Sequence, residues 1–443
     1  MLVTRYAGLL RARCKSNSKS MGSFPTLPEW VSLEHQVAQL LQQQEEHGWH
    51  FDERAARELE STLRSELELT RELLQQRHTF VEGPLFTAKR DNKTQGYVKG
   101  AQSTRLKQFN PTSRDHIAWI LQTHYGWTPS LMTNSGKVVI DETVLKEINI
   151  PFAQMCLKML DITKTLGMIS EGVNAWLKLC TTSSRVHHHC ATTTSTFRCS
   201  HRNPNLAQVP SDGSCRSLFT ATPGQVMVGA DLSGIELRML SHYLSRYDSG
   251  RYAEILLNGD IHQVNADKVG VSRSQIKTIT YAFLYGAGDA KIGHSYDKQL
   301  PENKAKSKGK EIRAAYVAAI PGLAELLSAV RERAADGYLK AIDGRKVYLT
   351  SPHCALNYLL QSSAAVLAKR WMVINNTNIK QLGLCCSQLA FIHDELQFES
   401  DPDHAEDLST SLVLSAKEAG EYYRIRCEIG AEAEIGNNWS EVH

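Results

Sequence analysis

Long hydrophobic runs are missing from this sequence of 443 residues. No stretch of about 18 or more consecutive apolar residues occurs, and the most hydrophobic windows carry charges, so no membrane-spanning helix is predicted. Internal repeats are missing as well, which excludes a solenoid. Charge of one sign is not in large excess: 50 Lys and Arg against 47 Asp and Glu give a net charge of +3, which neither demands nor excludes a polyanionic partner.

Regular cysteine spacing is also missing. The 10 cysteines stand at irregular intervals with no CxxC pair, so neither a disulfide-stapled small fold nor a zinc ribbon is predicted, and we expect reduced thiols. The run from His187 to Cys190 contains three histidines and a cysteine, but no second ligand cluster at zinc spacing accompanies it. We therefore interpret this run as structural or local.

What the sequence does contain is the composition of a folded protein. Apolar residues make up 42% and charged residues 22%, values typical of globular chains, and the length is enough for two or three modules around a sizeable core. Residues 1–28 differ, because they carry five basic residues and no acid. This pattern is typical of an organellar transit peptide; alternatively, residues 1–10 are the end of an upstream domain, cut by an internal start.

Apolar spacing in the first half predicts mainly helices. Helical periodicity covers residues 33–46 and 52–78, and more helical sequence runs from 113 to about 179. Between them, residues 83–111 gain glycines and basic residues, which predicts a basic tip. Such a tip is either solvated surface or a contact for a nucleic-acid backbone. The Ser/Thr-rich segment 181–200 then marks a change of architecture.

The second half alternates between strand and helix signals. A short buried strand is predicted at residues 226–228, and helical sequence returns over 250–342. A long helix is predicted over about 355–379. Residues 387–399 alternate about a turn, which predicts a β-hairpin.

Acidic residues stand at the ends of these predicted strands. Asp231 follows the apolar strand, and Asp394 and Glu395 lie in the turn of the predicted hairpin. A carboxylate in such a position can hold a metal ion over the edge of a sheet. Each acidic segment by itself is a weak signal, because short motifs of this kind discriminate loosely.

A third segment presents two cations and two aromatic rings at intervals of four residues, namely Arg273, Lys277, Tyr281 and Tyr285. On an α-helix, steps of four keep side chains on one slowly drifting stripe. Cations suit the oxygens of a polyphosphate, and rings suit the face of a base. Together with the acids, this stripe predicts a two-metal phosphoryl-transfer site that binds a nucleoside triphosphate.

These three segments resemble the motifs of the family A (DNA polymerase I-type) DNA-directed DNA polymerases, in particular the replicative enzymes of short-tailed, T-seven-like bacteriophages. Residues 231–238 look like motif A, residues 273–286 like motif B, and residues 393–395 like motif C. The resemblance spans roughly residues 30–443. The order and wide separation of the three motifs argue against chance agreement.

The resemblance implies an α+β fold shaped like a right hand, with a thumb, a palm built on an antiparallel sheet, and helical fingers. The implied domains are a leader or a remnant of an upstream exonuclease domain at 1–29, the thumb at 30–200 with its basic tip at 83–111, the palm at 201–249 and 343–443, and the fingers at 250–342.

Roles for individual residues also come from the resemblance. Asp231 and Asp394 would bind two Mg²⁺ ions, with Glu395 in a supporting catalytic role. Lys277 is the candidate proton donor to pyrophosphate, and Glu236 would exclude a 2′-hydroxyl. The residues that would bind the nucleotide are Arg273, Lys277, Tyr281, His262 and Glu236. The residues that would line the minor groove of primer-template DNA are Tyr285, Arg198, Asn357, Gln361 and His393.

The implied activity is template-directed addition of deoxynucleotides to a primer 3′ end during DNA replication, with release of pyrophosphate and no proofreading on this chain. Primer-template DNA and deoxynucleoside triphosphates would be its ligands, and no membrane is expected. A separate exonuclease or other replisome proteins are possible partners, whereas the short tip does not support a thioredoxin-type processivity factor. The expected location is the cytoplasm of a phage-infected bacterial cell, or the mitochondrion if the N-terminus is a transit peptide.

Two positions depart from the family pattern, since Ala282 and Phe197 stand where glycine is usual. Ala282 would add a methyl group where a templating base passes, and Phe197 would need a backbone shape that favours glycine. Three alternatives stay open: a metal-dependent nuclease that uses the same acids, a catalytically impaired DNA-binding remnant, and a single-subunit RNA polymerase, which Glu236 disfavours.

Overall fold

The computed structural model describes residues 27–443 except 130, 131, 134 and 299. The predicted leader at 1–29 therefore falls almost entirely outside the described residues, and its two interpretations stay predictions. Within the described ranges, no single helix has the length and apolar character to cross a bilayer. One pair, α14 (Glu302–Ala319) and α15 (Leu323–Ala334), passes that test only when both helices are taken together across a bend of 106°.

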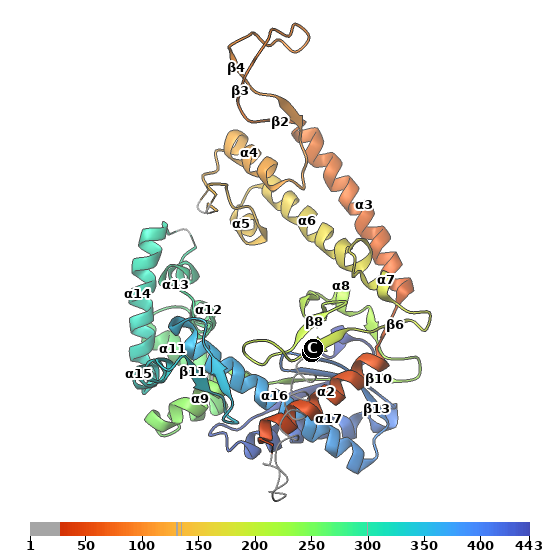
Figure 1. Cartoon of the computed structure of the whole chain (residues 1–443), viewed down its shortest axis with the longest axis vertical. Helices are drawn as coiled ribbons and strands as arrows, with labels where there is room; N and C mark the ends of the chain where they lie inside the picture. The colour runs from red at the N-terminus through yellow and green to blue at the C-terminus, as the bar shows by residue number, and fades with distance from the viewer. Residues whose placement is uncertain (1–26, 130–131, 134, 299) are drawn as a thin grey trace, which may run out of the picture.

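A four-stranded antiparallel sheet forms the base of the molecule (Figure 1). Its strands, in spatial order, are β13 (Cys386–Ile392), β14 (Glu395–Ser400), β10 (Val226–Leu232) and β15 (Ala431–Gly436). The predicted hairpin at 387–399 is confirmed as β13 and β14. The predicted strand at 226–228 is the start of the longer β10, whose middle residues are all buried because both faces of the sheet are covered.

Helices cover one face of this sheet, and an aromatic core covers the other. The helices are α16 (Ala355–Leu382), α17 (Ala405–Tyr422) and α2 (Glu29–His47). Val228 and Phe398 pack in the core that these helices share. Met227, one residue along β10, points to the opposite face and joins a core that contains Trp49 and Trp439.

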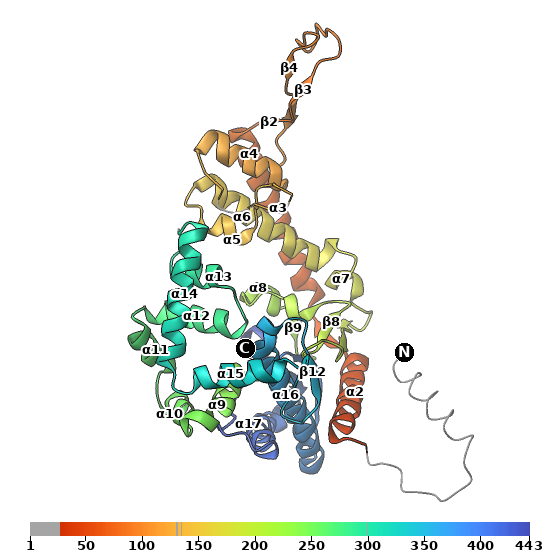
Figure 2. The ribbon, with the colours of Figure 1, turned by 60° about the vertical axis from the view of Figure 1, so that its left-hand side comes forward.

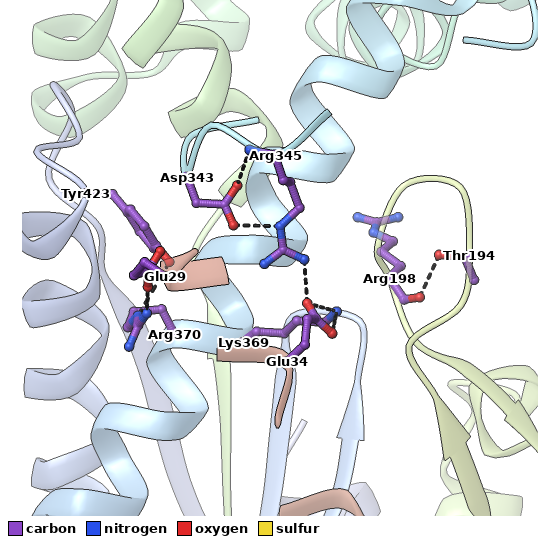
Figure 3. A network of polar contacts seen from close by, with 9 residues as sticks. All are labelled: Glu29, Glu34, Thr194, Arg198, Asp343, Arg345, Lys369, Arg370 and Tyr423. Carbon is purple, nitrogen blue, oxygen red and sulfur yellow. Dashed lines mark hydrogen bonds and ion pairs between the residues drawn. The ribbon is translucent and has the colours of Figure 1, made fainter. Parts of the chain in front are cut away.

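Helix α2 is attached to this body by buried ion pairs, which Figure 3 shows. The carboxylate of Glu34 accepts from Lys369 on α16 at 2.8 Å and from Arg345 at 2.5 Å. Arg345 is oriented in turn by Asp343 at 2.6 Å. Because Lys369 and Arg345 are almost fully buried, these charges are stabilised only while their partners stay in place.

A long helical arm rises from the sheet (Figure 1). It consists of α3 (Glu53–Arg77) and α6 (Pro151–Leu166), which lie side by side, with α4 (Arg114–Tyr125) and α5 (Glu142–Glu147) at the upper end. Asp52 caps α3 by accepting a hydrogen bond from the amide of Ala55. The basic tip forms two small ribbons, β2 (Phe80–Glu82) with β5 (Leu106–Gln108), and β3 (Phe86–Thr87) with β4 (Gln102–Ser103).

A second group of helices lies beside the sheet, to its left in Figure 1 (Figures 1 and 2). Besides α14 and α15, its helices are α9 (Ile235–Asp248), α10 (Arg251–Asn258), α11 (Ile261–Val269), α12 (Arg273–Leu284) and α13 (Asp289–Tyr296). Helices α13 and α14 approach closely at two glycines: a Cβ on Gly309 would lie 1.7 Å from the carbonyl oxygen of Asp289, and a Cβ on Gly293 would lie 1.9 Å from that of Ala305.

Short elements connect these bodies. They are β1 (Trp49–Phe51), α7 (Trp176–Leu179), β6 (Arg185–Val186), β7 (His189–Ala191), β8 (Ser200–Arg202), α8 (Gly213–Arg216), β9 (Phe219–Thr220), β11 (Tyr338–Lys340) and β12 (Lys346–Tyr348). The prediction that residues 250–342 are helical is wrong at the end of this range, where β11 is an extended strand that pairs with β12. The helices predicted over 33–46, 52–78 and 355–379 are confirmed as α2, α3 and α16.

Candidate active site

Asp231 and Asp394 lie on neighbouring strands at one edge of the sheet. Asp231 is near the end of β10 and pairs with Glu395, the first residue of β14. Asp394 precedes β14, and its carbonyl oxygen accepts from the Leu232 amide at 3.1 Å. The tight turn between β13 and β14 contains His393 with φ of 60°, the left-handed conformation that such turns require. The fold therefore brings together two acids that are far apart in the sequence.

The environment of these two acids favours their protonated forms. Burial raises the pKa of Asp231 to about 7, and the charges of Asp394 and Glu395 add to the rise. Burial also raises the pKa of Asp394 to about 6, and the negative charge of Glu236 contributes to this rise. One side of Asp231 is nevertheless open to solvent. Mutually repelling acids at an accessible edge fit a divalent cation, and carboxylate oxygens are the ligands that Mg²⁺ prefers.

Both oxygens of Glu395 are engaged by side-chain donors. Oε1 accepts from Nε1 of Trp439 and Nε2 of Gln397, each at 2.6 Å, and Oε2 lies 3.0 Å from Nδ1 of His443. Burial acts to raise the pKa of Glu395, but these three donors outweigh it and hold the pKa below its usual value. The hydrogen bond between His443 and Glu395 in turn raises the pKa of His443. Glu395 is therefore an ionised, fixed charge beside Asp231.

Glu236 is held from two sides in the first turn of α9. Its Oε1 accepts from Nη2 of Arg198 at 2.8 Å and from the hydroxyl of Tyr285 at 3.0 Å. Gly234, with φ of 56°, turns the chain from β10 into α9 and so returns Glu236 toward the two aspartates. We call Glu236, Arg198 and Tyr285 the Glu236 cluster.

The loop that carries Arg198 keeps a glycine-like backbone in spite of Phe197. Phe197 has φ of 65°, in the left-handed region that disfavours a bulky residue. Its ring lies 4.9 Å from the guanidinium carbon of Arg345, and the hydroxyl of Thr194 donates to the carbonyl of Arg198 at 2.6 Å (Figure 3). These contacts stabilise the strained loop. Ala282, the other departure from the family pattern, packs partly buried against the main core.

The predicted cation and aromatic stripe is present on α12. Arg273, Lys277 and Tyr285 are exposed and Tyr281 is half-buried, whereas Ile276, Ile279, Thr280 and Phe283 on the other side are buried. The rings of Tyr281 and Tyr285 are nearly parallel, with centroids 6.5 Å apart. Ser272 and Gln275 form a capping box that fixes the start of this helix.

His262 lies on α11 beside this stripe. Its ring centroid is 6.3 Å from that of Tyr281, and its Nδ1 is buried with no hydrogen-bond partner among the described residues. Arg273 forms an exposed ion pair with Asp260 at 2.6 Å. The guanidinium therefore has a carboxylate partner that an incoming phosphate would have to replace.

The remaining predicted DNA contacts lie on α16 and in the hairpin turn. Asn357 donates from Nδ2 to the carbonyl of Leu284 at 3.2 Å, which anchors the end of α12. Gln361 follows one turn later on the same helix and is half-buried, and His393 is exposed in the hairpin turn. The sequence prediction missed Gln397, whose side chain donates a hydrogen bond to Glu395. The available signal was its position two residues after Glu395, which places both side chains on the same face of β14.

Comparisons with known proteins agree with this geometry. Residues 86–441 match the model of "DNA polymerase family A". The chain is 32% identical to the DNA-directed DNA polymerase of Enterobacteria phage T3, over 94% of this chain and 70% of the relative. It is 31% identical to that of Escherichia phage T7 over the same shares. It is 25% identical to DNA polymerase I of Pseudomonas aeruginosa, over 76% of this chain and 39% of the relative.

A solved structure shares the fold. The POL domain of Pol1 from M. smegmatis, in complex with DNA primer-template and dNTP, superposes with a TM-score of 0.74 at 22% identity, covering 92% of this chain and 70% of that chain. This likeness confirms the predicted α+β polymerase fold. The family match and the phage relatives go further, and the chain belongs to DNA polymerase family A, the DNA-directed DNA polymerases.

Proposed function

We propose that this chain extends a primer 3′ end with deoxynucleotides on a DNA template, at a site that Asp231 and Asp394 form together with α12. The observation that carries the proposal is the combination of two repelling acids at a sheet edge with a helix that presents Arg273, Lys277 and Tyr281. Burial raises the pKa of Tyr281, and the charges of Glu236 and Asp394 raise it further, so α12 and the acids are close enough to interact electrostatically.

Asp231 and Asp394 would hold two Mg²⁺ ions. When bound, these ions supply positive charge that favours deprotonation of a 3′-hydroxyl and release of pyrophosphate. The acids must be ionised to bind them, so their raised pKa values make binding dependent on pH. Glu395 contributes a fixed negative charge next to Asp231 and stays bound to its own three donors.

The α12 stripe would bind the incoming nucleotide. Arg273 would exchange Asp260 for phosphate oxygens, and Lys277, one turn further, would contact the same triphosphate and donate a proton to the leaving pyrophosphate. His262 offers its unpartnered Nδ1 beside them. Tyr281 would stack on the nucleotide.

The Glu236 cluster would select deoxyribose and contact the DNA. Two hydrogen bonds fix the Glu236 carboxylate, so it cannot easily turn away from a ribose 2′-hydroxyl. Arg198 and Tyr285 would also face the minor groove of the primer-template, together with Asn357, Gln361 and His393. The arm of α3 and α6 would act as the thumb, the helices α10 to α15 as the fingers, and the sheet as the palm, with α2 attached to the palm helix α16.

Primer extension tests this proposal directly. A labelled primer on a defined template is incubated with Mg²⁺ and deoxynucleotides, and DNA binding is measured separately by fluorescence anisotropy. We expect templated extension by the wild-type chain. Binding without extension would favour the catalytically impaired remnant, and degradation of the DNA would favour the nuclease. A primer with a mismatched 3′ end tests the prediction that this chain does not proofread. Location and replisome partners stay predictions.

A further inference from the structure

A second group of metal-ligand side chains lies behind the catalytic hairpin, on the ribbon of β7 and β8. Cys190 and His201 are direct cross-strand partners there. His188 stands two residues before Cys190, and Cys199 stands two residues before His201. Because side chains alternate along a strand, the paired residues Cys190 and His201 lie on the same face of the ribbon. His188 directly precedes β7, and Cys199 directly precedes β8.

All four side chains are buried, and three of them lie close together. His188 is 0%, Cys199 5%, Cys190 7% and His201 8% exposed. Sγ of Cys190 lies 3.2 Å from Nδ1 of His201, and ligand atoms of His188, Cys190 and His201 all lie within 4.8 Å of one another. Zn–S bonds of about 2.3 Å and Zn–N bonds of about 2.0 Å place neighbouring ligands of a tetrahedral zinc roughly 3.5 Å apart.

His188 has a nitrogen that the protein leaves unsatisfied. Its Nδ1 is buried without a hydrogen-bond partner among the described residues, and its Nε2 lies 3.1 Å from Nε2 of Gln44. A buried polar atom without a partner costs free energy unless a ligand binds it.

We propose that His188, Cys190 and His201 form a structural zinc site. Binding of Zn²⁺ would release one proton from the Cys190 thiol, and the thiolate would balance part of the charge of the ion.

A zinc ion here would fix the ribbon against the catalytic hairpin. Sγ of Cys190 lies 3.7 Å from the carbonyl oxygen of Phe391 on β13, and the His201 ring is 6.3 Å from that of His393. The loop that joins β7 to β8 carries Arg198, which holds Glu236. The site would thus position the Glu236 cluster without touching substrate.

Metal analysis of the whole chain tests this proposal. The protein is purified in reducing buffer after expression with added zinc, and its metal content is measured by mass spectrometry. An Asp231→Asn/Asp394→Asn background removes the carboxylates that could bind zinc at the active site. We expect about one tightly bound zinc per chain in this background. Cobalt substitution should give thiolate-to-cobalt charge-transfer absorption and the visible bands of a tetrahedral site.

Variants separate the proposed ligands from their neighbours. Cys190→Ser should lose zinc and cobalt absorption, while His189→Gln, on the same strand but on its opposite face, should keep both. Less than about a tenth of an equivalent of zinc, together with absence of cobalt absorption in the otherwise wild-type chain, would overturn the proposal whatever the stability of the variants. A metal-free protein with a Cys190–Cys199 disulfide would overturn it too.

Discussion

Arg198 and Glu236 form an ion pair of 2.8 Å between the loop after β7 and the first turn of α9. Both side chains are mostly buried, so the pair is poorly screened by water. The contact joins a segment that precedes the sheet to the helix that follows Asp231, and it fixes the carboxylate that we expect to face the sugar of the nucleotide.

Glu236→Ala should relax discrimination against ribonucleotides. Removing the carboxylate opens space for a 2′-hydroxyl, so the ratio of kcat/KM for deoxynucleotides over ribonucleotides should fall by at least about tenfold. Single-nucleotide incorporation with dNTP and rNTP measures this ratio. Glu406→Ala, an exposed acid on α17, serves as the control. An unchanged ratio in Glu236→Ala would rule out the proposed selection of deoxyribose.

Asp231→Asn and Asp394→Asn should each lower primer extension by about 10³-fold or more while DNA binding persists. In the wild-type chain, the Mg²⁺ concentration for half-maximal activity should rise as the pH falls from 8 to 6. The reason is that the pKa values of about 7 and about 6 make protons compete with the metal in that range. A Mg²⁺ requirement that does not change with pH would contradict this assignment.

Asp231→Asn should also stabilise the metal-free protein. The pKa of Asp231 rises from 3.8 to about 7 on folding, so the folded state loses stability as the pH rises through this interval. The gain at pH 8 should be about 1 kcal/mol, because one side of Asp231 is open to solvent and water screens part of the repulsion. Thermal unfolding in EDTA should show a higher Tm for the variant at pH 8 and little difference at pH 4.

Glu399 should stabilise the fold at neutral pH and lose this effect in acid. It accepts from His47 at 2.5 Å, Arg185 at 3.0 Å and Thr222 at 2.6 Å, and these contacts outweigh burial and lower its pKa to about 2. Its contribution is complete above the unfolded pKa and declines as the pH falls from about 5 toward 2. Glu399→Gln should cost about 2–3 kcal/mol at pH 7 by denaturant unfolding, and the difference from wild type should shrink at pH 3.

Lys277→Ala should lower kcat/KM for deoxynucleotides by about 10- to 100-fold, because it removes a charge that contacts the triphosphate. Lys268→Ala is the matched control, since Lys268 lies on α11 and bonds the carbonyl of Ala319 at 3.1 Å. Steady-state incorporation of one nucleotide measures both variants. Normal incorporation by Lys277→Ala would contradict the proposed contact between Lys277 and the triphosphate.

Local sequence patterns predicted the elements that bear the chemistry. The four-residue spacing of α12 predicted its stripe because the helical period is a local property of the chain. The hairpin at 387–399 followed from alternation around a tight turn. The sequence missed β11, because a three-residue strand forms only when a partner strand is present.

The sequence by itself thus determined which residues carry charge, rings and turns, and its three motifs indicated the family. Only the tertiary structure decided which of these residues meet. Asp231 is paired with Glu395 by strand register, Glu236 contacts Arg198 across a loop, and Cys190 meets His201 through the pairing of β7 with β8. Such contacts depend on how non-local segments pair and pack, and no local period of the chain encodes that pairing.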